Sequence, residues 1–385
     1  MGGMARRYEV IVVGAGPAGS AAAALFAEQG RRVLVLDKAR FPRPKPCAEY
    51  ISPGGVNILD RLGALERIER TGQRRWLRGM QVRSPSGACH LVQYLDTQNR
   101  QSRGLSVSRL VLDLALVESA QAQGAEIRQG VRACGVWKQD GRVRGVVLSQ
   151  AGERLEADLV VGADGLHSAV AHSLGLHYRP LWPRRLGLIA HFAGVTWPED
   201  YGQMLLGQRG YVGAAPLDDD GLLTIGLVRR MPGGRLGSPA AALEVGLADH
   251  PDLARRLSRG RNLGGVMGIG PLACGAQKVA GPGFALLGDA AGFFDPFTGE
   301  GIFRALRGAE LLAAHLETYA RARQRTFGPK QRLVALIQIM VQTPRLMDFA
   351  IDRLRTRATV AKELGNVLGD LQPARLDLIW RLIGP

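Results

Sequence analysis

"YEVIVVGAGPAGSAAAALFAEQGRRVLVLDK", residues 8–38, decides the fold. Its first apolar run, VIVV, is short and continuous, as in a buried parallel strand. The run ends in the spacing GxGxxG, and an Ala-rich stretch then predicts a helix to about Gln29, which Gly30 can end. "RVLVLD" predicts a second buried strand. Together these elements predict a βαβ unit, the first part of a doubly wound sheet.

The spacing within this unit predicts a dinucleotide site. Gly14 permits the tight turn, Gly16 lets the backbone approach a pyrophosphate, and Gly19 lets the helix pack closely on the strand. The helix N-terminus offers free N–H groups and the positive end of its dipole to phosphates. Asp37 ends the second strand, where an acid accepts hydrogen bonds from ribose hydroxyls. At this point both NAD and FAD are open.

Two later stretches favour FAD. Residues 160–168, "VVGADGLHS", and residues 284–301, "FALLGDAAGFFDPFTGEG", both predict a buried strand that ends in an acid. An acid at the carboxyl end of a parallel strand faces the crevice where ligands bind. A second such site is unnecessary for a nicotinamide alone. It predicts a large cofactor bound end to end, with Asp289 on a polyol hydroxyl and the backbone of residues 299–302 against the far ring.

These ordered motifs resemble those of the FAD-dependent monooxygenase superfamily with the para-hydroxybenzoate hydroxylase fold. "PCAEYISPGG" and "GDAAGFFDPFTGEGI" are most similar to its geranylgeranyl reductase branch. The resemblance covers roughly residues 6–60, 104–175 and 270–315. It implies an α/β fold with a Rossmann-like FAD-binding domain, an antiparallel β-sheet substrate domain and a C-terminal helical segment.

The resemblance also implies which residues bind the cofactor. Asp37 would bind the adenosine ribose, Arg109 would reach the FAD from a helix start, and Asp164 would brace the cleft. Cys47 and Ala48 match a Pro-Cys-small element beside the flavin ring, so Cys47 is either a proton donor, a gating thiol or an inert packed group. The expected FAD-binding residues are Gly14, Gly16, Ala18, Gly19, Asp37, Lys38, Cys47, Ala48, Arg109, Val131, Asp164, Gly288, Asp289, Gly299, Gly301 and Ile302.

The FAD-binding domain is expected to be discontinuous, with residues 1–71, 104–180 and 270–317. Short alternating runs in residues 72–103 and 181–269 predict an antiparallel sheet over the flavin, and "PLDDDGLL" has the Asp-Gly of a hairpin turn. Residues 318–385 look helical and amphipathic, with Pro344 expected to break the helix. Their apolar positions predict a face packed on the body, or alternatively a tunnel or membrane-resting face for a hydrophobic substrate.

Charge and cysteine content narrow the classes of partner. The formal net charge is +16, but the basic residues are scattered without a Lys/Arg block, which argues against nucleic acid. The four cysteines have neither CxxC spacing nor a nearby His cluster, so no metal site and no disulfide scaffold are expected. We expect a cytoplasmic protein and leave peripheral contact with a membrane open. No apolar run is long enough to span one.

In such enzymes the flavin carries the chemistry, and two reactions fit the resemblance. In the first, FAD reduced by NADPH or NADH forms a C4a-hydroperoxide that hydroxylates a hydrophobic aromatic or polyketide-like metabolite. In the second, reduced FAD saturates a C=C bond of an isoprenoid or other lipid. No separate Rossmann unit for the nicotinamide is visible, so NAD(P)H is expected as a transient donor. A flavin-binding protein without turnover is a third hypothesis.

One departure bears on the choice. The reductase branch typically has a Tyr-x-Trp-x-Phe-Pro strand at its lipid site. Here "GYVGAAP" keeps Tyr211 and Pro216, the expected substrate-binding residues, but has small residues in place of the Trp and the Phe. A roomier or differently shaped substrate follows. The sequence therefore favours the monooxygenase, with the ene-reductase as the alternative.

Overall fold

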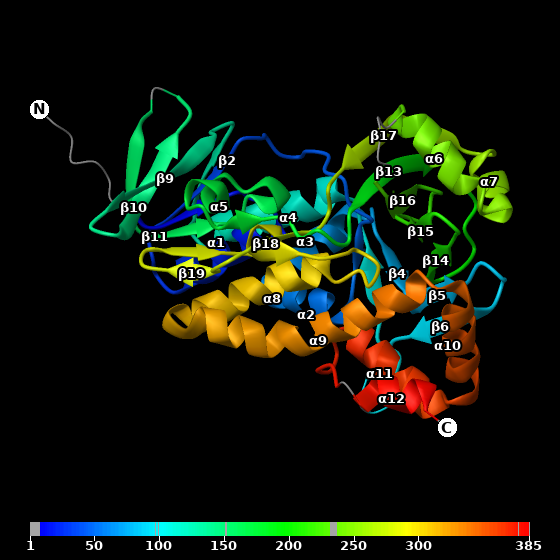
Figure 1. Ribbon diagram of the computed structural model, residues 1–385. Helices are drawn as coiled ribbons and strands as arrows, with labels where there is room; N and C mark the ends of the chain where they lie inside the picture. Colours follow the sequence, from blue (N-terminus) through cyan, green and yellow to red (C-terminus); the bar gives the residue numbers. More distant parts are fainter. Residues whose placement is uncertain are drawn as a thin grey trace, which may run out of the picture.

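A largely parallel sheet carries the nucleotide-binding half of the molecule in the computed structural model, which describes residues 8–96, 98, 100–150, 152–231, 237–375 and 377–384 (Figure 1). At its centre β1 (Tyr8–Val13) pairs in parallel with β2 (Val33–Asp37) and β11 (Arg154–Gly162). The sheet continues in parallel to β8 (Glu126–Gln129) on one side and β20 (Phe284–Leu286) on the other. Every side chain of β2 is buried, as expected for a strand covered on both faces.

Antiparallel strands complete this sheet at two places. The short β19 (Ala280–Gly281) pairs with β20 at the edge. The hairpin of β9 (Ala133–Gln139) and β10 (Arg142–Leu148) extends from β11 and lies at the left end of Figure 1. The predicted βαβ unit is confirmed, and the fold is the α/β class expected.

Helices cover the parallel sheet. The first, α1 (Pro17–Glu28), lies between α4 (Arg109–Ala122) and α8 (Gly301–Ala314). Its alanines at positions 21–23 are fully buried, and these small side chains let the helix approach its neighbours closely. The other helices of this half are α2 (Pro53–Arg61), α3 (Ala64–Thr71) and α5 (Ala169–Ser173), with 3₁₀ turns at Gly165–His167, Gly288–Ala291 and Leu316–Thr318.

A seven-stranded sheet forms the second half and appears at the right of Figure 1. Its neighbours are antiparallel except for one parallel pair, β14 and β5, which the sequence did not predict. The predicted hairpin is confirmed, because Pro216 pairs with Leu223 across the Asp-Gly turn. The strand order is β17 (Arg261–Ile269), β13 (Arg185–Ala193), β16 (Leu223–Arg230), β15 (Gly210–Pro216), β14 (Gly202–Leu206), β5 (Gly79–Arg83) and β6 (Cys89–Gln93).

Smaller elements flank this sheet and join the halves. Helices α6 (Pro239–Leu247) and α7 (Pro251–Leu257) cover its outer side. One three-stranded sheet contains β3 (Tyr50–Ile51), β7 (Gly104–Ser106) and β4 (Arg75–Leu77). The other contains β12 (His177–Tyr178), β18 (Cys274–Ala276) and β21 (Gly292–Phe293).

The C-terminal helices are α9 (Tyr319–Val341), α10 (Pro344–Thr356), α11 (Ala358–Leu368) and α12 (Asp377–Ile383), drawn in orange and red in Figure 1. The predicted break is confirmed: Pro344 opens α10, and the chain bends by 117° between the segments. Pro329 lies inside α9, which the sequence analysis did not anticipate.

The apolar face of these helices is packed, as the first of the two sequence alternatives predicted. Leu333, Ile337 and Ile351 belong to one buried cluster with Met204 and Tyr211 of the second sheet. Burying each large aliphatic side chain contributes about 1.5–3 kcal/mol. Among the described residues no single helix is long and apolar enough to cross a membrane, and only α9 and α10 taken together as a bent pair reach the required length and composition.

Candidate active site

The turn between β1 and α1 requires glycine at two positions. Gly14 has φ +99°, and a Cβ there would lie 2.6 Å from the carbonyl oxygen of Ala163. A Cβ on Gly19 would lie 1.8 Å from the carbonyl oxygen of Gly14. Both distances are far shorter than a van der Waals contact. The tight turn and the close approach of helix to strand therefore each need glycine, which has no Cβ.

Gly16 is different, because its neighbourhood is open. A Cβ there would meet only two guanidinium nitrogens, Nη2 of Arg43 at 3.8 Å and Nη2 of Arg109 at 3.9 Å. No side chain caps the N-terminus of α1 that follows. Free N–H groups, a helix dipole and two cations around an open backbone position suit the negative charges of a pyrophosphate. This cradle fits the diphosphate of FAD, with the N-terminal turn that contains Ala18 beside it.

Arg109 is held rigidly in this cradle. Ser108 caps α4 by accepting a hydrogen bond from Val111 N, which places Arg109 at the first helical position. Its guanidinium donates to both oxygens of the buried Asp113, at 2.8 Å and 2.7 Å. Arg43 lies 3.1 Å from the same carboxylate. Arg43 and Asp113 were not predicted from the sequence, in which the basic residues of "RPKPC" were the only signal.

Asp37 organises the adenosine end. Its carboxylate accepts hydrogen bonds from the backbone N–H groups of Ala15 and Ala39, both at 2.8 Å, and it is 7% exposed. Its carbonyl oxygen accepts from Val131 N at 2.9 Å, so the expected adenine-side residue lies beside the expected ribose acid. Lys38 beside it is exposed.

The flavin end is built from the third motif. Gly288 and Gly299 both have positive φ, +55° and +67°, and a Cβ on Gly299 would lie 2.8 Å from the ring of Tyr50. Asp289 and Ile302 line the same cavity as Gly16. The structure thus brings the first and third motifs to one cavity, although more than 250 positions separate Gly16 from Asp289 in the sequence.

Asp164 is not among the residues that line this cavity, whereas its neighbours Ala163 and Gly165 are. Its carboxylate accepts hydrogen bonds from Ser168 Oγ at 2.5 Å and from Val170 N at 3.2 Å. Burial raises the pKa of Asp164 above its ordinary value. The side chain therefore shapes the turn into α5, which suits the bracing role expected of it.

The wall opposite the cradle is apolar and comes from the second sheet and the loop before α8. Tyr211 contributes its ring, and Gly213 lies where the resemblance would place a tryptophan, so the cavity is open at that point. Pro216 is buried at the end of β15 and does not line the cavity. The remaining apolar wall residues are Ile189, Met204, Val228, Ile269, Leu272 and Phe293.

Cys47 lines this cavity beside Ala48. Its sulfur accepts a hydrogen bond from Glu49 N at 3.3 Å. Burial raises the pKa of the Cys47 thiol, although nearby Arg109 opposes that shift. The raised pKa favours the protonated form of Cys47, which suits this thiol to hold a proton better than to act as a thiolate nucleophile.

A buried polar network lies behind Tyr211 and was not anticipated. The Tyr211 hydroxyl donates to Asp295 at 2.6 Å, and Gln338 of α9 donates to the same oxygen at 2.7 Å. Arg185 donates to Asp295 at 2.8 Å and to Gln338 Oε1 at 2.6 Å. Asp295 also accepts from Phe297 N. This network of hydrogen bonds connects α9 and the loop that contains Asp295 to Tyr211 in the cavity wall.

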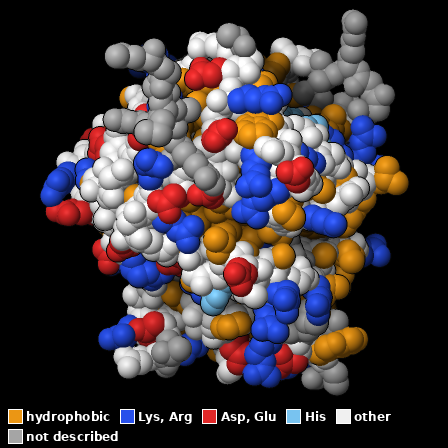
Figure 2. Space-filling view, turned by 90° about the vertical axis from the view of Figure 1, so that its left-hand side faces the viewer, with side chains coloured by type: hydrophobic (Ala, Val, Ile, Leu, Met, Phe, Trp, Pro, Cys, Tyr) orange, Lys and Arg blue, Asp and Glu red, His pale blue; other side chains and the backbone are white. Residues whose placement is uncertain are grey.

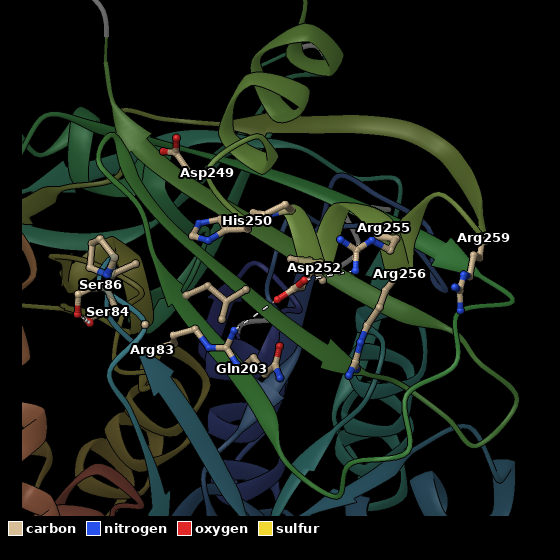
Figure 3. A pocket seen from close by; sticks show the side chains of 16 residues that line it. Arg83, Ser84, Ser86, Gln203, Asp249, His250, Asp252, Arg255, Arg256 and Arg259 are labelled. Carbon is tan, nitrogen blue, oxygen red and sulfur yellow. Dashed lines mark hydrogen bonds and ion pairs between the residues drawn. The ribbon is translucent and has the colours of Figure 1, made fainter.

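A second hollow, drawn in Figure 3, is lined by Gln203 and Leu205 of β14, whereas Met204 between them in the sequence lines the cavity. Several arginines line this hollow, and carboxylates pair with some of them. Arg256 donates to both oxygens of Glu199, and Arg83 lies 3.8 Å from Asp252. Figure 2 shows the same mixture of Lys or Arg with Asp or Glu over another face. The net positive charge is therefore spread over a mixed surface, and this hollow is separated from the cavity by the sheet.

Comparison with known proteins agrees with this site. Residues 7–190 match the FAD binding domain family. The chain is 32% identical to the digeranylgeranylglycerophospholipid reductase of Methanosarcina mazei, covering 80% of this chain and 74% of that protein. It is 30% identical to the menaquinone reductase of Mycolicibacterium smegmatis, covering 99% and 97%. A flavoprotein/dehydrogenase from Cytophaga hutchinsonii has the same fold, with a TM-score of 0.83, 20% identity and coverage of 94% and 93%.

Proposed function

The chain belongs to the FAD-dependent monooxygenase-type superfamily of flavoproteins, and from this premise we propose that it is an ene-reductase that saturates a carbon–carbon double bond in the prenyl chain of a lipid. It is an FAD-dependent oxidoreductase, which the family establishes. The proposal adds the reaction and the substrate class. NADPH or NADH is the proposed electron donor.

One observation carries the proposal: the Cys47 thiol, whose pKa is raised by burial, lines the same cavity as the apolar wall of the second sheet. Saturating a double bond needs a hydride for one carbon and a proton for the other. Bound FAD supplies the hydride chemistry. Cys47 is held beside that site as a neutral thiol, and the apolar wall excludes water that would compete for the reacting carbons.

The wall suits a prenyl chain. Its side chains are aliphatic, thioether or aromatic, and such surfaces bind hydrocarbon by burial instead of hydrogen bonding. Gly213 and Gly226 face the cavity from neighbouring strands and leave room for a branched chain. The relatives' names also support the proposal, because two of them are reductases named for a prenyl lipid or a lipid quinone.

Hydroxylation of a hydrophobic aromatic metabolite is the second candidate. The same apolar lining favours it, because a reactive oxygen species has to be shielded from water. The sequence favoured hydroxylation because the segment between Tyr211 and Pro216 has small residues where the reductase branch has a Trp and a Phe. The relatives and the neutral thiol reverse that preference.

The test is an anaerobic one. The FAD-loaded protein is reduced with light, mixed with menaquinone in detergent, and followed by flavin absorbance and by mass spectrometry of the lipid. We expect reoxidation on mixing and a product that gains two hydrogen atoms in its prenyl chain. Reoxidation only by oxygen, with a hydroxylated aromatic product, would establish the second candidate instead.

A matched pair of variants tests the site. Gly213→Trp places in the cavity the ring that the reductase branch has at this position. A Cβ there would already be in van der Waals contact with Met204, at 3.6 Å, so we expect the variant to narrow the cavity and slow the reduction of menaquinone while FAD still binds. Gly268→Trp puts the same ring on an exposed position of the same sheet and should leave the reaction unchanged. Equal activity of the two variants would place the lipid elsewhere.

Contact with an anionic membrane surface is part of the proposal. Leu181 is 92% exposed and Trp182 is 48% exposed on the loop before β13, with Arg179 and Arg184 exposed beside them. The Trp182 ring packs on Phe294, which adjoins the cavity wall. Aromatic and basic residues together suit the interface of an anionic bilayer. Trp182→Ser should reduce sedimentation with phosphatidylglycerol vesicles, and unchanged sedimentation would rule this contact out.

A further inference from the structure

Glu49 is held in an unusual conformation at the end of the Cys47 loop. Its φ is +58°, a region that residues other than glycine rarely occupy. Its carbonyl oxygen accepts hydrogen bonds from Val107 N and Ser106 Oγ, and its side chain is almost completely buried. Such a conformation persists only where the surroundings fix it, and Glu49 is among the residues that line the cavity.

Both carboxylate oxygens of Glu49 have partners. Oε1 accepts from the backbone N–H of Arg109 at 2.8 Å, at the positive end of α4. Oε2 lies 2.6 Å from Nε2 of His191 on β13. The hydrogen bond to Glu49 raises the pKa of His191, although burial opposes the shift. The imidazole is therefore charged to a higher pH than an isolated histidine.

His191 connects this carboxylate to solvent. It lies two residues beyond Ile189 on β13, so both side chains stand on the cavity face of the sheet. The His191 side chain is 20% exposed, whereas that of Glu49 is 3% exposed. One end of the pair thus meets water and the other meets the cavity.

We propose that Glu49 and His191 form a proton relay that carries protons from solvent to the cavity beside Cys47. In each transfer the Nε2–H bond of the His191 imidazolium breaks and an O–H bond forms on Glu49. The neutral imidazole then turns its free Nε2 to solvent and takes a proton from a hydronium ion or a buffer acid, which leaves water or the conjugate base behind. The Glu49 acid releases its proton into the cavity and returns to the carboxylate, so no oxidant or reductant is consumed. The inference rests on the proposed function in one respect: the reduction of a double bond consumes the proton that the relay delivers.

The groups that surround the pair come from the loop of Cys47, from α4, from β16 and from β17, where Leu263 pairs with His191. On its own loop Glu49 has the neutral thiol of Cys47, with Arg43 and Lys45 earlier in that loop. From α4 it faces Arg109, whose guanidinium is neutralised by Asp113. On β16 the residue opposite His191 is Thr224, which is uncharged, buried and without a hydrogen-bond partner in the described part of the chain. Glu49 is therefore the one acid that faces His191 among these groups.

The first measurement is the titration of His191 by NMR in the FAD-loaded protein. We expect a pKa above about 6.5, the value of an unperturbed histidine. Glu49→Gln keeps the shape of the side chain and removes its charge, and it should return the pKa of His191 to that value or below. An unshifted titration in Glu49→Gln would overturn the relay, and this result does not depend on which substrate the enzyme uses.

The second measurement is the pH dependence of lipid reduction. His191→Gln retains a hydrogen-bond donor but cannot titrate, and we expect it to lower the rate about 100-fold near neutral pH and to remove the ionisation of His191 from the profile. His90→Gln, on the distant β6, is the control and should leave the profile unchanged. An unchanged profile in His191→Gln would also overturn the relay. Melting temperature and FAD affinity, unchanged in both variants, would separate this effect from misfolding.

If the wild-type protein fails to reduce any prenyl lipid, the proposed function fails and the NMR titration still decides the relay. Coupling between Glu49 and His191 would then support proton delivery for the other candidate reaction. If lipid reduction proceeds but the titration shows no coupling, the reductase stands and the relay is wrong. The two proposals therefore fail separately.

Discussion

The guanidinium of Arg109 and the carboxylate of Asp113, one helical turn apart on α4, form two hydrogen bonds of 2.8 Å and 2.7 Å in a buried environment. This pair fixes the cation that faces Gly16, and a cation held in advance loses little entropy when an anion binds. The affinity for the diphosphate therefore depends on a carboxylate that does not line the cavity.

Asp113→Asn should destabilise the FAD-free protein by about 3–5 kcal/mol, because breaking a buried ion pair leaves a charge without its partner. FAD affinity, measured by fluorescence titration, should fall as well. Glu118→Gln is the matched control on the same helix, since that partly exposed residue pairs loosely with Arg67 at 3.4 Å and its substitution should cost at most about 1 kcal/mol. Unfolding of Asp113→Asn at the wild-type urea concentration would contradict the role of this pair.

Two glycine substitutions should separate folding from cofactor binding. Gly16→Ala places a methyl group in the open cradle, so the FAD-free protein should keep its stability to within about 0.5 kcal/mol while FAD affinity falls at least about tenfold. Gly14→Ala should destabilise the fold itself, because φ is +99° and a backbone carbonyl blocks the Cβ. Urea unfolding and FAD titration of both variants check this, and normal FAD affinity in Gly16→Ala would place the diphosphate elsewhere.

Cys47 should react slowly with iodoacetamide at neutral pH. Its pKa is raised by burial, and it is less exposed than Cys134, so we expect its alkylation to be roughly tenfold slower or more than that of Cys134 in the FAD-free protein. The rate should rise as the pH increases through the raised pKa. Mass spectrometry of the alkylated peptides gives both rates in one sample. Equal rates at neutral pH would show an activated thiolate and remove the proton-donor role.

Gln338→Leu should destabilise the protein by about 1–3 kcal/mol, since Arg185 and Asp295 each lose a buried hydrogen-bond partner. Gln324→Leu lies on the same helix at an exposed position and should change stability by no more than about 0.5 kcal/mol. Thermal unfolding of the two variants is the comparison. Similar melting temperatures would mean that the network behind Tyr211 does not anchor α9.

The nucleotide-binding half could be predicted from local sequence because each signal lies within one short stretch. The GxGxxG spacing, the buried strands and Asp37 follow from rules that involve neighbours along the chain. The break at Pro344 follows from the ring of a single residue. The domain boundaries drawn from the sequence stay a prediction.

The relay and the buried network could not be predicted in this way. Glu49 and His191 are 142 positions apart, and Tyr211 and Asp295 are 84 apart. Neither pair has a spacing that local periodicity can detect, since the contacts exist only after two sheets meet. The substrate-binding role expected of Pro216 came from the resemblance and was wrong. Pro216 matches its position in the motif, but it is buried and does not line the cavity.

The contacts of α9 have a practical consequence for anyone who shortens or recombines this gene. Every cofactor motif precedes Tyr319, so a fragment that ends after α8 would look complete to a motif search. It would nevertheless lack Gln338 and the apolar helix face that packs with Met204 and Tyr211. The apolar surface exposed at these residues would promote aggregation. Exchange of the C-terminal helices between relatives is accordingly a route to altered substrate range, because those helices support the wall without touching the chemistry.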